Sequence, residues 1–145
     1  MDTKFSIALH ILVYIKETEN IVTSDLLAKS VGTNASYIRK IITLLKGADI
    51  IESQQGKKGI SLKTPQERLT LDQVYYAVYP DKELLHIHDT SNQECPVGDN
   101  IREALLPIFE ESERQLISSL SKVTPVSYTH LILFLTHGSF INPSI

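Results

Sequence analysis

Polar and basic side chains gather on one face of a predicted helix that runs from Ala35 to about Lys46. Hydroxyl, guanidinium and ammonium groups of this kind donate hydrogen bonds to DNA phosphates and to the edges of bases in a groove. Two further polar residues precede the helix at its capping positions. The candidate DNA contacts of this stretch are Thr33, Asn34, Ser36, Tyr37, Arg39, Lys40 and Thr43.

The spacing of small and apolar residues predicts that this helix is the second helix of a helix-turn-helix. A shorter helix is expected from Leu26 to Val31, and Gly32 supplies the positive φ that the following turn needs. Counted from Ser24, Ala28 is fifth, Gly32 ninth and Ile38 fifteenth, which is the spacing of the motif. The same pattern also fits a helical hairpin in any small domain, with the basic residues merely solvated. One face of the second helix is expected to be buried, through Ile38, Ile41, Ile42 and Leu45.

A predicted β-hairpin strengthens the DNA-binding interpretation. Three helices, the first being the apolar run from Phe5 to Lys16, precede two β-prone segments at 50–53 and 60–63. The turn between these segments is polar, basic and rich in glycine. A wing of this kind lies over the phosphates beside the groove, where lysines are useful, although ordinary hairpin tips often have the same composition. The candidate wing contacts are Gln55, Lys57 and Lys58.

The charge of the chain is divided between its two parts. Residues 1–68 carry ten basic and seven acidic side chains, whereas the remainder carries four and ten, so +3 precedes −6. A basic first part followed by an acidic second part fits a DNA-binding module joined to a part that does not touch DNA.

A long amphipathic helix is predicted from Asn100, as its capping residue, to about Leu120, with a bend at Pro107. A domain of about 80 residues can close its own core, so the apolar stripe of this helix needs another partner. A second copy is the simplest partner, and its two-fold symmetry matches a palindromic DNA site. The candidate dimer contacts are Ile101, Leu105, Ile108, Phe109, Leu116 and Leu120.

The single cysteine, Cys95, lies in the loop before this helix. A nearby helix N-terminus favours the thiolate, which is the oxidisable form, so Cys95 is a candidate redox sensor. The acidic neighbours Glu94 and Asp99 act in the opposite direction. A buried structural cysteine is the alternative.

Two histidines in a possible short strand, from Leu84 to His88, raise the question of a metal site. His86 and His88 would lie on one face of such a strand, and Cys95 could complete a mixed set of ligands. Partly exposed loop histidines explain so weak a pattern more simply. No metal and no cofactor is therefore predicted.

The order of elements and the motifs resemble the Rrf-two family of bacterial transcriptional regulators, over roughly residues 4–120. Within that family the chain is similar to members with a Cys-Pro-Val-Gly segment before the long helix, here residues 95–98. The resemblance implies a homodimer in which the long helix crosses its partner, a palindromic operator and, usually, repression. Some members bind an iron–sulfur cluster through three cysteines, whereas this chain has one. The resemblance is carried by Leu26–Ala28, Ser30–Val31, Tyr37–Lys40, Leu44–Leu45, Ala48–Ile51, Gly56–Gly59 and Leu71–Val78.

No residue pattern predicts an enzyme, since the Gly56–Gly59 segment is too short for a phosphate-binding loop and lacks its Lys-Ser/Thr ending. A winged-helix protein–protein adaptor that does not bind DNA is the remaining alternative. No apolar run of about 18 residues predicts a membrane helix, and no secretory signal is seen, so a cytoplasmic protein is expected.

We therefore expect a mainly α fold with a small β-hairpin wing (α+β) in four parts. These are a winged helix-turn-helix at 1–80, a sensor or linker loop at 81–99, a dimerisation helix at 100–123 and a tail of unknown role at 124–145.

Overall fold

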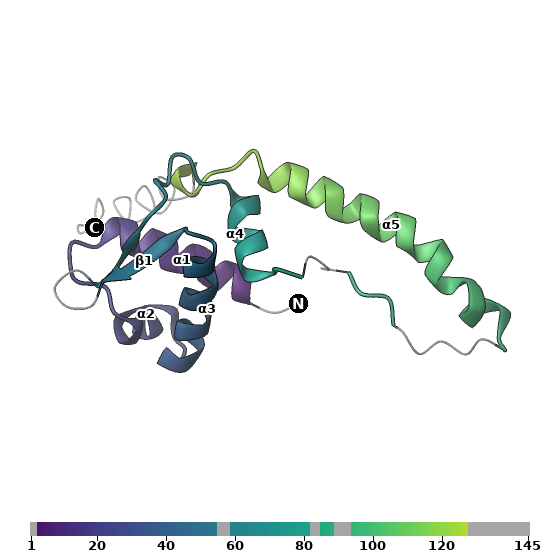
Figure 1. Ribbon diagram of the computed structural model, residues 1–145, viewed down its shortest axis with the longest axis horizontal. Coiled ribbons are helices and arrows are strands. Elements are labelled where there is room, and N and C mark those ends of the chain that lie inside the picture. Colours follow the sequence, from purple (N-terminus) through teal and green to yellow (C-terminus); the bar gives the residue numbers. More distant parts are fainter. Residues whose placement is uncertain (1–2, 55–58, 82–84, 89–93, 128–145) are drawn as a thin grey trace, which may run out of the picture.

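The computed structural model describes residues 3–54, 59–81, 85–88 and 94–127. Three helices are followed by a two-stranded antiparallel hairpin, a short helix and a long helix, which is the order of a winged helix (Figure 1). The predicted fold class is therefore confirmed. The elements are α1 (Lys4–Glu17), α2 (Ser24–Val31), α3 (Ala35–Gly47), β1 (Ile51–Gln54), β2 (Gly59–Leu62), α4 (Leu71–Val78) and α5 (Pro96–Leu120).

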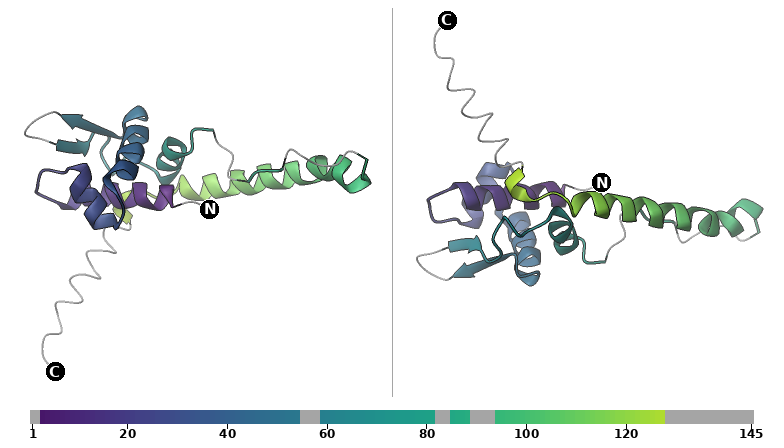
Figure 2. Two further views of the ribbon diagram at one scale, coloured as in Figure 1. Left: turned by 90° about the horizontal axis from the view of Figure 1, so that it is seen from below. Right: turned by 90° about the horizontal axis from the view of Figure 1, so that it is seen from above.

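The hydrophobic core lies entirely within the winged unit, which comprises α1 to α4 and the hairpin. Its buried side chains extend from Ala8 to Val78, and they come from α1, α2, α3, both strands and α4. The unit thus closes its own core, as predicted. The helix α5 extends away from this unit (Figure 2). None of its residues is buried, so its apolar positions are without a full cover.

The helix-turn-helix forms where its sequence signals predict it. The Leu26 N–H donates to the Thr23 Oγ1 at 3.2 Å, which caps α2, and the Tyr37 N–H donates to the Asn34 Oδ1 at 2.8 Å, which caps α3. Between the two helices, Gly32 has a φ of 81°, in the left-handed region where a Cβ is resisted. These caps fix the turn that sets the direction of α3.

The hairpin is tied at its base to the helical unit. Its register pairs Ile51 with Leu62 and Gln54 with Gly59. The Ile60 N–H donates to the Val22 carbonyl at 3.0 Å, which ties β2 to the segment between α1 and α2. The wing therefore leaves the core from a fixed base.

The long helix begins earlier than the sequence predicts. Cys95 is its N-cap residue and Pro96 its first residue, so the expectation that Asn100 caps it is wrong. Proline is favoured at the first helical position because its missing N–H would be unsatisfied there in any case. Asn100 instead donates from Nδ2 to the Pro96 carbonyl at 2.8 Å within the helix, which continues on both sides of Pro107.

The predicted strand near His88 is also wrong within residues 85–88, which have no regular secondary structure. A strand needs a neighbour to satisfy its backbone groups, and the sheet of the described chain consists of β1 and β2 alone. In the described part of the chain, no helix is long and apolar enough to span a membrane.

The chain returns to the winged unit after α5. The Leu71 N–H, at the start of α4, donates to the Val123 carbonyl at 2.9 Å. Pro125 is fully buried, and the returning segment lies beside α1 (Figures 1 and 2). The first residues of the predicted tail therefore pack on the winged unit, while residues 128–145 lie outside the described chain.

Candidate nucleic-acid interface

The helix α3 has one face in the core and one face in solvent. Its four buried side chains, at 38, 41, 42 and 45, are the ones that the sequence predicts. Ser36, Arg39, Lys40 and Thr43 are exposed on the other side. The apolar face fixes the rotation of the helix about its axis, and so it determines which polar groups a ligand can reach.

Several predicted contact residues also have structural tasks at this face. The Asn34 Oδ1 accepts the capping bond of α3, so its amide group is what remains to donate to a ligand. The Thr43 hydroxyl donates to the Arg39 carbonyl at 2.8 Å, one turn earlier in the helix. Tyr37 and Thr33 are half-buried, and Tyr37 packs against the core. These residues position α3 whether or not they also touch a ligand.

Arg39 and Lys40 are the cations that remain available. Within the described chain neither forms an ion pair or a side-chain hydrogen bond. By contrast, Lys63 beside the hairpin lies 2.7 Å from Asp49, and its pKa is raised by that hydrogen bond and by the charge of Asp49. The positive charge of Lys63 is therefore already balanced, whereas the charges on α3 are not.

Lys46 joins this face and was not among the predicted contacts. It is exposed, and its Nζ donates to the Ser53 Oγ on β1 at 2.7 Å, which links the end of α3 to the base of the wing. Its position seven residues after Arg39 on a predicted helix is the signal that could have indicated it. The predicted wing contacts Gln55, Lys57 and Lys58 lie outside the described residues.

The chain matches the model of the family Rrf2, described as iron-dependent transcriptional regulator, over residues 1–125. It belongs to the Rrf2 (Rrf-two) family. YwnA of Bacillus subtilis (strain 168), whose name assigns it provisionally to the HTH-type transcriptional regulators, is 38% identical over 121 residues, which are 83% of this chain and 90% of that protein. Membership makes the chain a transcriptional regulator with a winged helix, and both the family and YwnA are described as regulators rather than enzymes.

Solved structures agree with this assignment. A crystal structure described provisionally as a DNA-binding protein has a TM-score of 0.66 at 34% identity, and the match covers 84% of this chain and 95% of that one. CymR (YrzC), the global cysteine regulator of B. subtilis, has a TM-score of 0.63 over 90% of this chain and 96% of its own. At 15% identity, CymR shows the shared fold alone.

The iron in the family description is not matched by the donor groups of this Rrf2 chain. A cluster needs about four ligands, mostly thiolates, and Cys95 is the single cysteine. Among the described residues, no group of three or more His, Cys, Asp or Glu side chains could hold a metal ion. His86 and His88 are exposed, and they do not form such a group with Cys95.

Cys95 itself is exposed at the N-terminus of α5, so it is not the buried structural cysteine of the alternative. The backbone N–H groups of Gly98, and then of Val97, lower the pKa of its thiol. Neither of these two N–H groups makes a capping hydrogen bond of standard geometry to the Cys95 sulfur. The helix N-terminus thus favours the thiolate, as the sequence suggests, in spite of the nearby carboxylates.

The predicted dimer residues divide between two faces of α5. Ile101, Leu105 and Ile108 recur at intervals of four and three residues, and Ile108 is 59% exposed. Phe109 and Leu116 instead line hollows that face other parts of the same chain. Leu120 is half-buried at the end of the helix.

Proposed function

We propose that this Rrf2 protein is a sequence-specific repressor that binds a palindromic operator as a homodimer. The observation that carries the proposal is the exposed face of α3, where Arg39 and Lys40 have no ion-pair partner in the described chain. With α3 in the major groove, these side chains reach base edges and phosphates, while the wing lysines lie over the neighbouring backbone. A protein held on an operator in this way blocks access to the promoter.

The exposure of the apolar side chains of α5 supports the homodimer. A helix of 25 residues with no buried side chain leaves a large apolar area in water, which a second copy can cover. Dimerisation would place two copies of α3 about one helical turn of DNA apart, as a palindrome requires.

Replacing the basic residues of α3 is the direct test of DNA recognition. At fixed salt, Arg39→Ala is expected to weaken operator binding by about five- to a hundredfold and to relax the base preference at one position in each half-site. Lys40→Ala should weaken binding to all sequences and reduce the salt dependence. The site comes from selection on random duplex DNA, and affinity from fluorescence anisotropy.

Lys122→Ala is the matched control, because this exposed lysine follows α5 and lies outside the proposed interface. It should bind the operator as the parent protein does. If selection enriches no sequence, DNA recognition is contradicted, and the protein–protein adaptor becomes the better hypothesis.

We further propose that oxidation of Cys95 regulates binding. Since its pKa is lowered, Cys95 should react with iodoacetamide faster at neutral pH than the same thiol in the denatured chain, with a rate midpoint at lower pH. A midpoint equal to that of the denatured chain would contradict a poised thiolate. Operator binding that responds to hydrogen peroxide in the parent and equally in Cys95→Ser would exclude Cys95 as the sensor.

A further inference from the structure

A cavity of about 390 Å³ lies between α4 and α5, and we refer to it as the α4–α5 cavity. Tyr75 and Tyr76 line it from α4, and residues from Glu110 to Ile117 line it from α5. Its volume falls in the range of sites for small organic molecules. Ile101, Leu105 and Ile108 do not line this cavity, whereas Leu116, another of the predicted dimer contacts, does.

The α4 wall of this cavity is aromatic. Tyr75 is only 5% exposed, and its ring packs edge-on to Phe5 and Tyr76. Its hydroxyl makes no hydrogen bond within the described chain. Burial, followed by the charge of Glu113, raises the pKa of Tyr75, so the hydroxyl stays neutral and its oxygen can accept from an N–H donor.

A neighbouring tyrosine of the same aromatic cluster contacts a cation. The Lys4 Nζ lies 5.1 Å from the centre of the Tyr79 ring, and that ring packs against Tyr75. A positive charge over a tyrosine face is stabilised by the ring quadrupole. A tyrosine of this cluster therefore already interacts with a positive charge, which shows the kind of contact that its rings can make.

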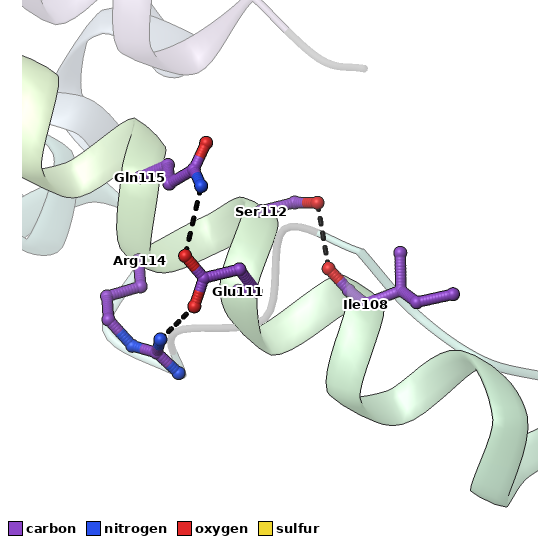
Figure 3. Close-up of polar contacts among 5 residues, drawn as sticks. All are labelled: Ile108, Glu111, Ser112, Arg114 and Gln115. Atoms are coloured by element: carbon purple, nitrogen blue, oxygen red, sulfur yellow. Dashed lines mark hydrogen bonds and ion pairs between the residues drawn. The ribbon is translucent and has the colours of Figure 1, made fainter.

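The α5 wall of the cavity is acidic and apolar. Glu110 and Glu113 contribute carboxylates, and Leu116 and Ile117 contribute aliphatic surface. Arg114 also lines the cavity, but its guanidinium pairs with Glu111, as Figure 3 shows.

The charge of Arg114 is thus balanced outside the cavity. Glu111 also accepts from the Gln115 Nε2 at 3.0 Å, so both of its carboxylate oxygens are engaged (Figure 3). Of the two carboxylates that line the cavity, Glu110 has no ion-pair or hydrogen-bond partner within the described chain, whereas Glu113 accepts the Leu85 N–H. An anionic ligand would meet two carboxylates, whereas a cation would be attracted by them.

We propose that the α4–α5 cavity binds a small organic monocation with an apolar body. The ammonium group lies between the carboxylates of Glu110 and Glu113 and the tyrosine wall, and its N–H groups donate to the Tyr75 oxygen. The apolar body contacts Leu116 and Ile117. A metal ion is not the ligand, because the described residues offer no group of three suitable donors.

The position of the cavity gives such a ligand a route to control DNA binding, and this step rests on the proposed function. α4 packs against α3, whereas α5 carries the proposed dimer contact. A molecule seated between α4 and α5 changes how the two are held together, and so changes the separation of the two copies of α3 in a dimer. The ligand acts only as far as it binds one arrangement better than the other.

The test uses three soluble probes of similar size and different charge: benzylammonium, benzyl alcohol and benzoate. Binding to the full-length protein is measured without DNA by ligand-observed NMR titration at neutral pH. We expect benzylammonium to bind with a dissociation constant that is roughly millimolar or lower, and at least about tenfold more tightly than either of the other probes.

Glu110→Gln should weaken benzylammonium binding by about tenfold, and Glu113→Gln by a similar factor. Glu110 is the cleaner variant, since the Glu113 Oε1 also accepts the Leu85 N–H at 3.2 Å. Glu103→Gln, which makes the same change of charge on an exposed part of α5 outside the cavity, should bind as the parent does.

Equal binding of benzyl alcohol, or equal weakening by Glu103→Gln, would overturn the assignment of a cation site, as would no binding of benzylammonium at all. Operator affinity is then compared with and without saturating benzylammonium. No change in it would overturn the regulatory step, while the probe titration still supports the site. If selection on random duplex DNA enriches no site in the absence of benzylammonium, that result contradicts the proposed function and leaves the assignment of the cation site unaffected.

Discussion

Replacement of Gly59 by alanine is expected to destabilise the winged unit by about 2–4 kcal/mol. Gly59 has a φ of 59°, and a Cβ built on it would lie 2.4 Å from the Val22 carbonyl oxygen and 2.8 Å from the Ile21 Cγ2. The left-handed conformation alone costs a residue with a Cβ about 1–2 kcal/mol. Relief of the clash requires β2 to move away from Val22, which also breaks the Ile60–Val22 hydrogen bond.

Two other glycines serve as matched controls for this substitution. Gly32 also has a positive φ, but a Cβ there would have no neighbour within 4 Å, so Gly32→Ala should cost only about 1–2 kcal/mol. Gly47, at the end of α3, has neither constraint, so Gly47→Ala should be neutral or stabilising by about 0.5–1 kcal/mol. Urea unfolding followed by circular dichroism gives the three values. Equal losses at Gly59 and Gly32 would show that the close approach to Val22 contributes nothing.

Most of the winged unit could be predicted because its signals are local. Thr23, Gly32 and Asn34 act on backbone groups within a few residues of themselves, so their types and spacing determine the caps and the turn. The start of α5 was predicted incorrectly for a local reason of another kind. Asn100 is the stronger capping residue by type, but Pro96 is favourable at a first helical position, and the helix extends to it.

The features that escaped prediction depend on contacts between distant segments. The hydrogen bond from Leu71 to Val123 joins residues that are about fifty positions apart, and Pro125 is buried two residues later. No local sequence pattern predicts either feature. The same is true of the candidate sites. The polar face of α3 follows from periodicity alone, whereas the division of the α5 apolar residues between an outward face and the α4–α5 cavity depends on where α4 lies.

The outward face of α5 leads to the second large effect, on dimerisation. Ile108 is 59% exposed, and it lines neither the α4–α5 cavity nor the hollow between α5 and residues 85–88. A charged residue at this position should therefore leave the fold of a single chain intact. In a dimer that forms through this face, however, the same residue would bury a charge without a partner in each copy, and unpaired buried charges are strongly unfavourable.

Ile108→Glu is therefore expected to give a folded monomer that binds the palindromic operator about a hundredfold or more weakly than the parent. A monomer contacts one half-site only, so it loses the gain in affinity that comes from binding both half-sites at once. Ser118→Glu introduces the same charge at an exposed position of α5 outside the row of Ile101, Leu105 and Ile108, and it should remain a dimer with parental affinity. Mass from light scattering and operator affinity are measured on the same samples, together with the melting temperature. A monomeric Ile108→Glu protein that keeps full operator affinity would separate DNA recognition from dimerisation. A dimeric one would place the contact between the two copies on another face.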